Sequence, residues 1–316
     1  MLSVVSADYG GGYAGSGFRY GSNAREFSLA GALVADKIPG FYAFSNPSLL
    51  HLSRDNHIGI SYQKMSLDRS IQSVSFTRRL PPNAGVGLSY LRAGTDNIMG
   101  RDRMNNKTIS FSSSEIEWII SFGVAFGSKF ALGINIKAFF PSIAPEIIDV
   151  QSGRGIGWDV GFIYKLHRHL ILGGVFENLS SRYNWKMTKD GEPDSYEDFF
   201  PQTIKLGIYY TALRNISICF QEDIVSIPGN NINYRSRLGV EYRLTNNVKL
   251  RGGLVQALGS VTSDEKINDI NLKPSFGAGI PIKAWKKQSL QMDYALDLGS
   301  VGEGLSHLFS FSMKIK

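Results

Sequence analysis

The stretch Ile116-Glu117-Trp118-Ile119-Ile120-Ser121-Phe122-Gly123-Val124-Ala125-Phe126 decides the fold. Its even-numbered residues are all large and apolar, whereas its odd-numbered residues are mostly small or polar. Successive side chains of a β-strand point to opposite faces, so this alternation predicts a strand with one apolar face. The same pattern returns along the chain, for example at 58–62, 130–137, 156–164, 204–210, 238–244 and 309–315.

Extended over the whole chain, the alternation predicts about fourteen strands, an even number. We place them at 56–63, 69–80, 84–93, 114–127, 129–140, 154–165, 168–178, 201–212, 214–225, 232–244, 247–257, 271–283, 287–296 and 305–315.

The composition agrees with a β protein and leaves a membrane location open. Among 316 residues there are 34 glycines, 12% are aromatic and only 19% are charged, a balance that favours strands over helices. No run of eighteen apolar residues occurs, which excludes a transmembrane helix. A transmembrane strand needs only about 9–11 residues with every second one apolar.

The predicted connections alternate between short and long. Most of the long ones fall at 94–113, 141–153, 179–200 and 258–270, with short ones between them. Outer-membrane β-barrels have short periplasmic turns and longer outer loops. The pattern therefore predicts a barrel in a bacterial outer membrane, with the chain's N-terminal part and C-terminus on the periplasmic side and the long loops outside.

A soluble β-sandwich or propeller is the alternative, but it would have to bury the apolar face between two layers. In a barrel, lipid covers that face and the other face lines the lumen. We therefore predict an all-β fold, a transmembrane antiparallel up-and-down β-barrel of about fourteen strands. Its expected lumen-facing polar residues are Glu117, Lys137, Asp159, Arg237, Glu241, Arg251 and Asp293.

The chain divides into three predicted parts. Residues 1–7 end in Val5-Ser6-Ala7, small residues typical of a signal-peptide cleavage site, and are interpreted as the remnant of a signal peptide or as an extended N-terminus. Residues 8–55 lack the alternation and are predicted to form a hatch or plug. Residues 56–316 form the barrel, and the alternating strand 307–315 is expected to close it on the first strand.

Sequence motifs for catalysis or metal binding are weak. Gly10–Gly15 matches G-x-G-x-x-G but lacks the βαβ context of a nucleotide site. His167 and His169 have no neighbouring carboxylate or cysteine, and Cys219 has no nearby histidine. We therefore expect no enzyme activity, no cofactor and no metal. Lys and Arg are spread along the chain, which argues against nucleic acid as a partner.

A series of short motifs resembles the PorV/PorQ family of outer-membrane proteins within the FadL-like superfamily. Ahead of the first strand it comprises Ala24-Arg25, Ala30-Gly31-Ala32, Ala35-Asp36 and Asn46-Pro47-Ser48-Leu49-Leu50. Ala30 replaces a glycine of the family pattern and Ser48 an alanine. Further matches are Leu132–Lys137, Gly157–Gly161, Glu177-Asn178-Leu179, Gly239–Arg243, Arg251-Gly252-Gly253 and Asp293-Tyr294-Ala295.

The resemblance implies a fourteen-stranded barrel with an N-terminal hatch, in which Ala24, Arg25, Gly31, Asn46 and Pro47 carry the hatch motif. It implies two functions. A PorV/PorQ-like barrel serves type IX secretion as a receptor or shuttle, with the secretion translocon and the C-terminal domains of exported proteins as partners. A FadL-like barrel passively carries hydrophobic compounds across the outer membrane.

Of these two functions, the charged lumen favours the secretion role, because transport of hydrophobic compounds requires a continuous apolar path. Lipid and lipopolysaccharide of the outer membrane are expected around the barrel in both cases. Aromatic residues of the 179–200 loop fit either an interfacial girdle or a contact surface for cargo. Its candidate outer contacts are Tyr183, Trp185 and Tyr196.

Overall fold

The computed structural model describes residues 13–38, 40–143, 153–189, 192–226, 232–244, 248–258, 271–285, 288–298 and 305–315. The expected signal-peptide remnant at 1–7 lies outside these residues. So do 8–12 of the expected hatch and most of the predicted loops at 141–153 and 258–270.

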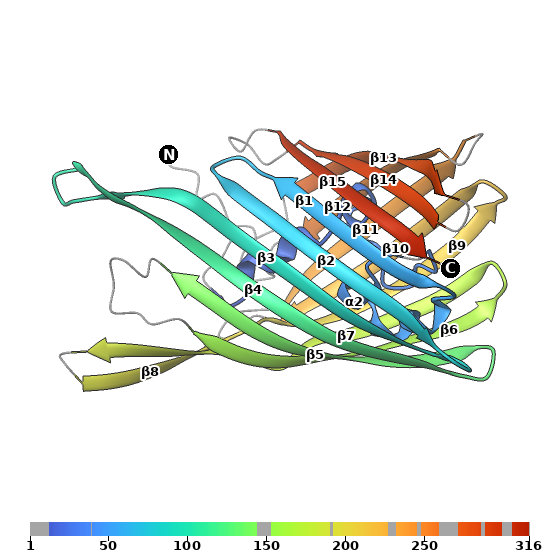
Figure 1. Cartoon of the computed structure of the whole chain (residues 1–316), viewed down its shortest axis with the longest axis horizontal. Coiled ribbons are helices and arrows are strands. Elements are labelled where there is room, and N and C mark those ends of the chain that lie inside the picture. Colours follow the sequence, from blue (N-terminus) through green and yellow to red (C-terminus); the bar gives the residue numbers. More distant parts are fainter. Residues whose placement is uncertain are drawn as a thin grey trace.

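Fifteen strands form a single antiparallel sheet in the described part of the chain (Figure 1). Their bounds are β1 (Asn56–Lys64), β2 (Arg69–Leu80), β3 (Ala84–Arg101), β4 (Lys107–Phe126), β5 (Phe130–Ile143), β6 (Arg154–His167), β7 (Leu170–Lys189), β8 (Glu192–Phe199), β9 (Gln202–Leu213), β10 (Ile216–Ser226), β11 (Ile232–Arg243), β12 (Lys249–Leu258), β13 (Asn271–Trp285), β14 (Gln288–Asp297) and β15 (Ser306–Ile315).

The sheet closes on itself, which leaves no free edge in the barrel wall. β1 pairs with β15, where Ile60 lies opposite Phe311, and β6 pairs with β7. β8 and β9 pair with successive parts of the same strand β7, so together they fill one position in the wall. The barrel thus has fourteen positions, and the prediction of an all-β, antiparallel, fourteen-stranded barrel is confirmed.

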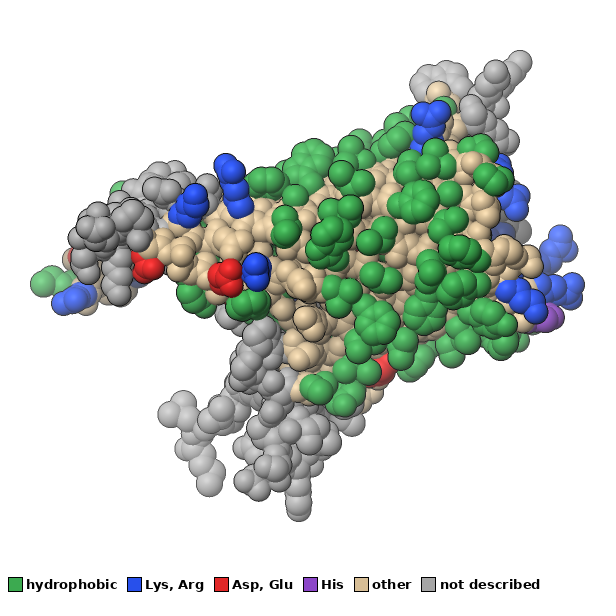
Figure 2. Space-filling model, turned by 90° about the horizontal axis from the view of Figure 1, so that it is seen from below, with side chains coloured by type: hydrophobic (Ala, Val, Ile, Leu, Met, Phe, Trp, Pro, Cys, Tyr) green, Lys and Arg blue, Asp and Glu red, His purple; other side chains and the backbone are tan. Residues whose placement is uncertain are grey.

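The two faces of each strand differ as the alternation predicts. Trp118 is 44% exposed on the outside, whereas its neighbour Ile119 is 1% exposed on the inside. Outward apolar side chains form a broad band around the barrel (Figure 2). Because water does not favour so large an apolar surface, this band fits a lipid environment.

Two of the predicted long loops are in fact strands. β3 runs on to Arg101 and β4 begins at Lys107, so the expected loop 94–113 shrinks to a tight turn. At that turn, the carboxylate of Asp102 accepts hydrogen bonds from the backbone N–H groups of Met104 and Asn106, both at 2.8 Å. Hydrogen bonds from the side chain and backbone of Asn106 lower the pKa of Asp102. Likewise, β7 and β8 occupy most of the expected loop 179–200 and project beyond the barrel with β3 and β4 (Figure 1).

Four short helical elements precede the first strand. They are the 3-10 helix η1 (Ser16–Tyr20), α1 (Ala24–Ser28), α2 (Tyr42–Ser45) and the 3-10 helix η2 (Pro47–Leu52). They pack against the inner faces of strands far apart in the sheet. η2 lies against β2 to β6, and α1 against β12 to β15. We refer to residues 13–55 as the N-terminal segment.

No helix in the described ranges is long and apolar enough to cross a membrane.

Candidate ligand cavity in the barrel lumen

The N-terminal segment approaches the barrel wall at backbone distance. A Cβ atom added to Gly133 on β5 would lie 2.3 Å from the carbonyl carbon of Pro47, and one on Gly161 of β6 would lie 2.2 Å from Oδ1 of Asn46. Only glycine fits at such distances, so these two positions let η2 rest directly on the strands.

Asn46 fixes the start of η2. Its side-chain amide donates to the carbonyl oxygens of Val34 at 2.7 Å and Phe162 at 3.1 Å. Its Oδ1 atom accepts from the backbone N–H of Ser48 at 3.0 Å, an N-cap interaction that satisfies a helix-terminal donor. Pro47 follows at the first helical position, where proline is favoured. The Asn46-Pro47 motif thus holds the N-terminal segment against β6.

Buried ion pairs hold the other side of the N-terminal segment. The Arg25 guanidinium pairs with Asp36 within the segment and, at 3.2 Å, with Glu241 on β11. Arg251 on β12 pairs with Glu241 and with Asp293 on β14, each at 2.8 Å. All five side chains are buried, and each charge has an opposite charge beside it.

A second buried network lies on β4, β5 and β6. The ammonium group of Lys137 pairs with Glu117 at 3.2 Å and with Asp159 at 3.0 Å. Asn135 donates to Asp159 and, at 2.8 Å, to the carbonyl oxygen of Ala43 in α2. This network therefore joins the wall to the N-terminal segment at a further point.

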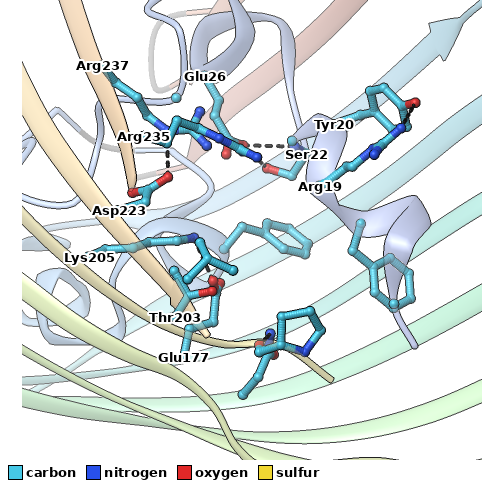
Figure 3. A pocket seen from close by; sticks show the side chains of 18 of the residues that line it. Arg19, Tyr20, Ser22, Glu26, Glu177, Thr203, Lys205, Asp223, Arg235 and Arg237 are labelled. Carbon is cyan, nitrogen blue, oxygen red and sulfur yellow. Dashed lines mark hydrogen bonds and ion pairs between the residues drawn. The ribbon is translucent and has the colours of Figure 1, made fainter. Parts of the chain in front are cut away.

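Two more ion pairs lie on the neighbouring strands β7 to β11 (Figure 3). Lys205 pairs with Glu177 at 2.8 Å, and Arg237 pairs with Asp223 at 2.7 Å. Arg237 also donates to the carbonyl oxygen of Ala30 at 2.7 Å. Here too the charged groups of the lumen compensate one another.

An aromatic cluster lies on β5, β7 and the N-terminal segment, farther along the strands that carry Lys137 and Glu177. The ring of Phe139 on β5 stacks on Phe200 with centroids 4.4 Å apart and on Phe18 of η1 at 6.2 Å. Tyr183 and Trp185 of β7 complete the cluster. Burial of large rings makes this an apolar, shape-defined surface.

Glu115 on β4 ties η1 to this cluster. Its carboxylate accepts hydrogen bonds from the backbone N–H groups of Gly15 at 3.0 Å and Gly17 at 2.8 Å. It also accepts one from the hydroxyl of Tyr183 at 3.1 Å. The position of the segment that carries Phe18 is therefore fixed by three donors.

Between these walls and the N-terminal segment lies a cavity of about 580 Å³. Phenylalanines line part of it, namely Phe18, Phe27, Phe44 and Phe200. Its described lining contains six cations and six anions, which cancel: Arg19, Lys137, Lys205, Arg235, Arg237 and Lys273 against Glu26, Glu117, Asp159, Glu177, Asp223 and Asp297. Such a cavity suits an uncharged ligand, because no net charge attracts an ion into it.

The structure places the residues singled out in the sequence as follows. The polar residues Glu117, Lys137, Asp159, Arg237, Glu241, Arg251 and Asp293 all point inward, and all are buried except Arg237, which is partly exposed. The residues Ala24, Arg25, Asn46 and Pro47 are buried against the strands, and Gly31 lies against Arg237.

Two of the three expected outer contacts were wrong. Tyr183 is 1% exposed and Trp185 is 7% exposed, because both point into the aromatic cluster. Tyr196 is 57% exposed, on β8.

Several residues of the site were not singled out from the sequence, above all Glu115 and Phe18, whereas Phe200 was one of the aromatic residues of the 179–200 loop. Lys205 and Asp223 stand at inward positions of their strands, so the alternation itself carried the signal for them. Glu115 also stands at an inward position, but no sequence signal marked its contact with a distant segment.

The fold and lumen define a β-barrel of the outer-membrane type whose N-terminal segment lies inside it. Similar solved structures include the toluene transporter TbuX of Ralstonia pickettii, with 13% identity, 94% of this chain and 99% of that chain covered, and a TM-score of 0.68. The toluene transporter TodX of Pseudomonas putida has 13% identity, coverage of 93% and 98%, and a TM-score of 0.65. A FadL homologue of Pseudomonas aeruginosa has 11% identity, coverage of 93% and 98%, and a TM-score of 0.62.

No family model matches the sequence, and no curated protein sequence is significantly similar to it. At these identities the likeness shows the fold: this chain has the fourteen-stranded barrel of FadL-like channels.

Proposed function

We propose that this protein is a passive channel that carries small, uncharged hydrophobic compounds across the outer membrane. The observation that carries the proposal is the lumen cavity, whose described lining combines four phenylalanines with charged groups that cancel. Its volume of about 580 Å³ is within the usual range of small-molecule sites. Structures of the same fold include toluene transporters and a FadL homologue, which supports the same function.

The charged lumen, which favoured the secretion role in the sequence analysis, does not oppose transport of a hydrophobic compound. Lys137 pairs with both Glu117 and Asp159 within 3.2 Å, Lys205 pairs with Glu177 at 2.8 Å, and the described lining as a whole has equal numbers of cations and anions. Because these charges are paired, the four phenylalanines of the lining remain available to an apolar ligand. A polar lumen and a hydrophobic ligand are therefore compatible.

The N-terminal segment acts, in this proposal, as the hatch that was expected at 8–55. Its contacts with β2 to β6 and β12 to β15 support it on both sides of the lumen, so a ligand passes the segment only where the segment or the wall yields. The short turns are assigned to the periplasm, and the projecting ends of β3, β4, β7 and β8 to the outside, as in barrels with short periplasmic turns.

Uptake of radiolabelled toluene by cells tests the proposed function. Thr203→Trp places a large ring in the cavity, since Thr203 lines it, and should reduce uptake to that of cells lacking the protein. Leu206→Trp on the lipid-facing side of the same strand is the matched control and should leave uptake unchanged. Equal uptake by cells with wild-type protein, with Thr203→Trp and without the protein would rule out the channel.

A second candidate is the PorV/PorQ-like role in type IX secretion. The projecting strand ends favour it, because they present exposed apolar side chains beyond the lipid band, among them Met104, Tyr196 and Phe199. Affinity purification from outer membranes would recover translocon components or C-terminal domains of exported proteins if this role applies. Met104→Ser with Tyr196→Ser should then abolish recovery while toluene uptake persists.

A further inference from the structure

One end of the barrel carries exposed positive charge at five of its connections, from β2 round to β12. We define the basic rim as six exposed cations of the short connections and the strand ends beside them: Arg78, Arg79, Lys129, Arg168, Arg214 and Arg243. They belong to the β2–β3, β4–β5, β6–β7, β9–β10 and β11–β12 connections or to the strand ends beside them. Figure 2 shows Lys and Arg side chains gathered at its right-hand end, past the apolar band.

Negative charge is missing from the same connections. In these five connections and in the β13–β14 connection, the sequence contains no Asp or Glu, and none occurs in the two residues on either side of each connection. Asp55, near the start of β1, lies at this end but pairs with Lys314 at 3.5 Å. The opposite end mixes both signs, with exposed Asp102, Asp194 and Glu197 among its cations.

No described residue neutralises the basic rim. None of its six members forms an ion pair with another described residue, and Arg79 donates only to the carbonyl oxygen of Pro82, at 3.3 Å. Like charges around one rim repel one another unless an external anion compensates them. The partner of the rim is therefore anionic and lies outside the chain.

The arrangement identifies the partner. The six cations are distributed around the barrel, so a folded protein docked on one side would reach only a few of them. A lipid leaflet surrounds the barrel on every side. Exposed Tyr164, Tyr210 and Tyr242 lie on the same strands just inside the rim, where aromatic residues mark the membrane–water interface.

We propose that the basic rim binds the phosphate headgroups of anionic phospholipids in the leaflet on the short-turn side. Long Lys and Arg side chains reach from the end of the apolar band to the headgroups while their stems stay on apolar surface. The function of this contact is to fix the depth and tilt of the barrel in the bilayer. It does not depend on what the lumen carries.

The test uses the full chain in vesicles of phosphatidylcholine, with or without phosphatidylglycerol, and follows urea unfolding by the heat-modifiable gel shift. In the five-site rim variant, Arg78, Lys129, Arg168, Arg214 and Arg243 are changed to Gln. In the matched control, five exposed cations of the opposite end, Arg101, Arg103, Lys107, Arg154 and Lys186, are changed to Gln.

Phosphatidylglycerol should raise the folded-to-unfolded ratio of the wild type at low salt, by up to about five-fold for each rim cation. The rise should disappear in the rim variant. It should also disappear at about 1 M salt, where the Debye length falls to roughly 3 Å and exposed charges are screened from one another. It should persist in the control variant. If the rim variant does not fold, the wild type is measured at increasing salt concentration. A phosphatidylglycerol effect that does not decrease with salt would then contradict the proposal.

An equal rise in the rim variant and the wild type would overturn the proposal. So would an equal rise when soluble tripolyphosphate replaces phosphatidylglycerol, because the partner would then be a soluble anion. A larger rise with lipopolysaccharide than with phosphatidylglycerol, lost in the rim variant, would reassign the rim to the other leaflet. None of these outcomes affects toluene uptake, so the channel proposal is tested independently.

Discussion

Arg25 of the N-terminal segment and Glu241 of β11 form a buried ion pair, with Nε and Oε2 3.2 Å apart. The two residues are separated by more than two hundred positions in the chain, and the pair fixes one end of the segment to the wall. Because Arg251 shares the same carboxylate at 2.8 Å, the pair also connects the segment to β12.

Arg25→Met should destabilise the protein strongly, because it leaves the carboxylates of Asp36 and Glu241 buried with less compensation. Breaking one partner of a buried pair costs about 3–5 kcal/mol. We expect a lower urea midpoint and proteolysis within the N-terminal segment. Arg54→Met, at an exposed position of the same segment, is the control. Equal midpoints for the two variants would contradict the anchoring role.

Gly133→Ala should displace η2 from the wall, because the added Cβ would lie 2.3 Å from the backbone of Pro47. Overpacking of this kind costs about 1–3 kcal/mol. Single-channel recordings in planar bilayers should show more frequent openings if the segment closes the lumen. Gly252→Ala is matched in chemistry but meets no atom within 4 Å, so it should behave as the wild type.

Asp223→Asn should change the charge preference of the cavity. Removal of this carboxylate leaves Arg237 without its ionic partner at 2.7 Å and gives the lining one excess positive charge. Binding of 2-naphthoate should improve relative to uncharged 2-naphthol by about ten-fold, or about 1.4 kcal/mol. Fluorescence titration of nanodisc-embedded protein measures the ratio. Asp194→Asn, an exposed carboxylate outside the lumen, should leave the ratio unchanged.

The β3–β4 turn should depend on pH only under strongly acidic conditions. Hydrogen bonds from Asn106 lower the pKa of Asp102 from its ordinary value of 3.8. A lowered pKa means that the turn is fully stabilised above pH 3.8 and loses this contribution as the pH falls through the lower value. Amide resonances of Met104 and Asn106 should report the transition, and Asp102→Asn should remove it. A midpoint above pH 3.8 would contradict the assignment.

Cysteine labelling of intact cells should fix the orientation. The natural Cys219 is buried, so it should contribute little background. Asn105→Cys in the β3–β4 turn should react with a membrane-impermeant maleimide added to whole cells. Asn215→Cys in the short β9–β10 turn should react only after the outer membrane is permeabilised. The reverse pattern would place the short turns outside.

Alternation alone was sufficient to predict the barrel wall, because lipid and lumen impose opposite polarities on neighbours such as Trp118 and Ile119. It failed where β7 leaves the apolar band. There the outward residues Arg182, Asn184 and Lys186 are polar and the inward Tyr183 and Trp185 are aromatic. The period of two persists, but water replaces lipid outside the strand, so the inverted pattern resembled a loop.

The cavity could not be predicted in the same way. The contact of Glu115 with Gly15 and Gly17 joins residues about a hundred positions apart, and no local pattern encodes it. The hatch motif indicated which residues matter in the N-terminal segment, whereas the partners of Arg25 and Asn46 required the folded chain.

The contacts of the N-terminal segment also set an order of assembly. The N-terminal segment precedes every strand in the chain, yet it packs on β2 to β6 through η2 and on β12 to β15 through α1, and so has its supports at both ends of the sheet. Before the barrel closes, those two groups of strands are not yet neighbours. We therefore expect this segment, although it is synthesised before the strands, to become ordered after them, so that closure of the wall precedes closure of the passage.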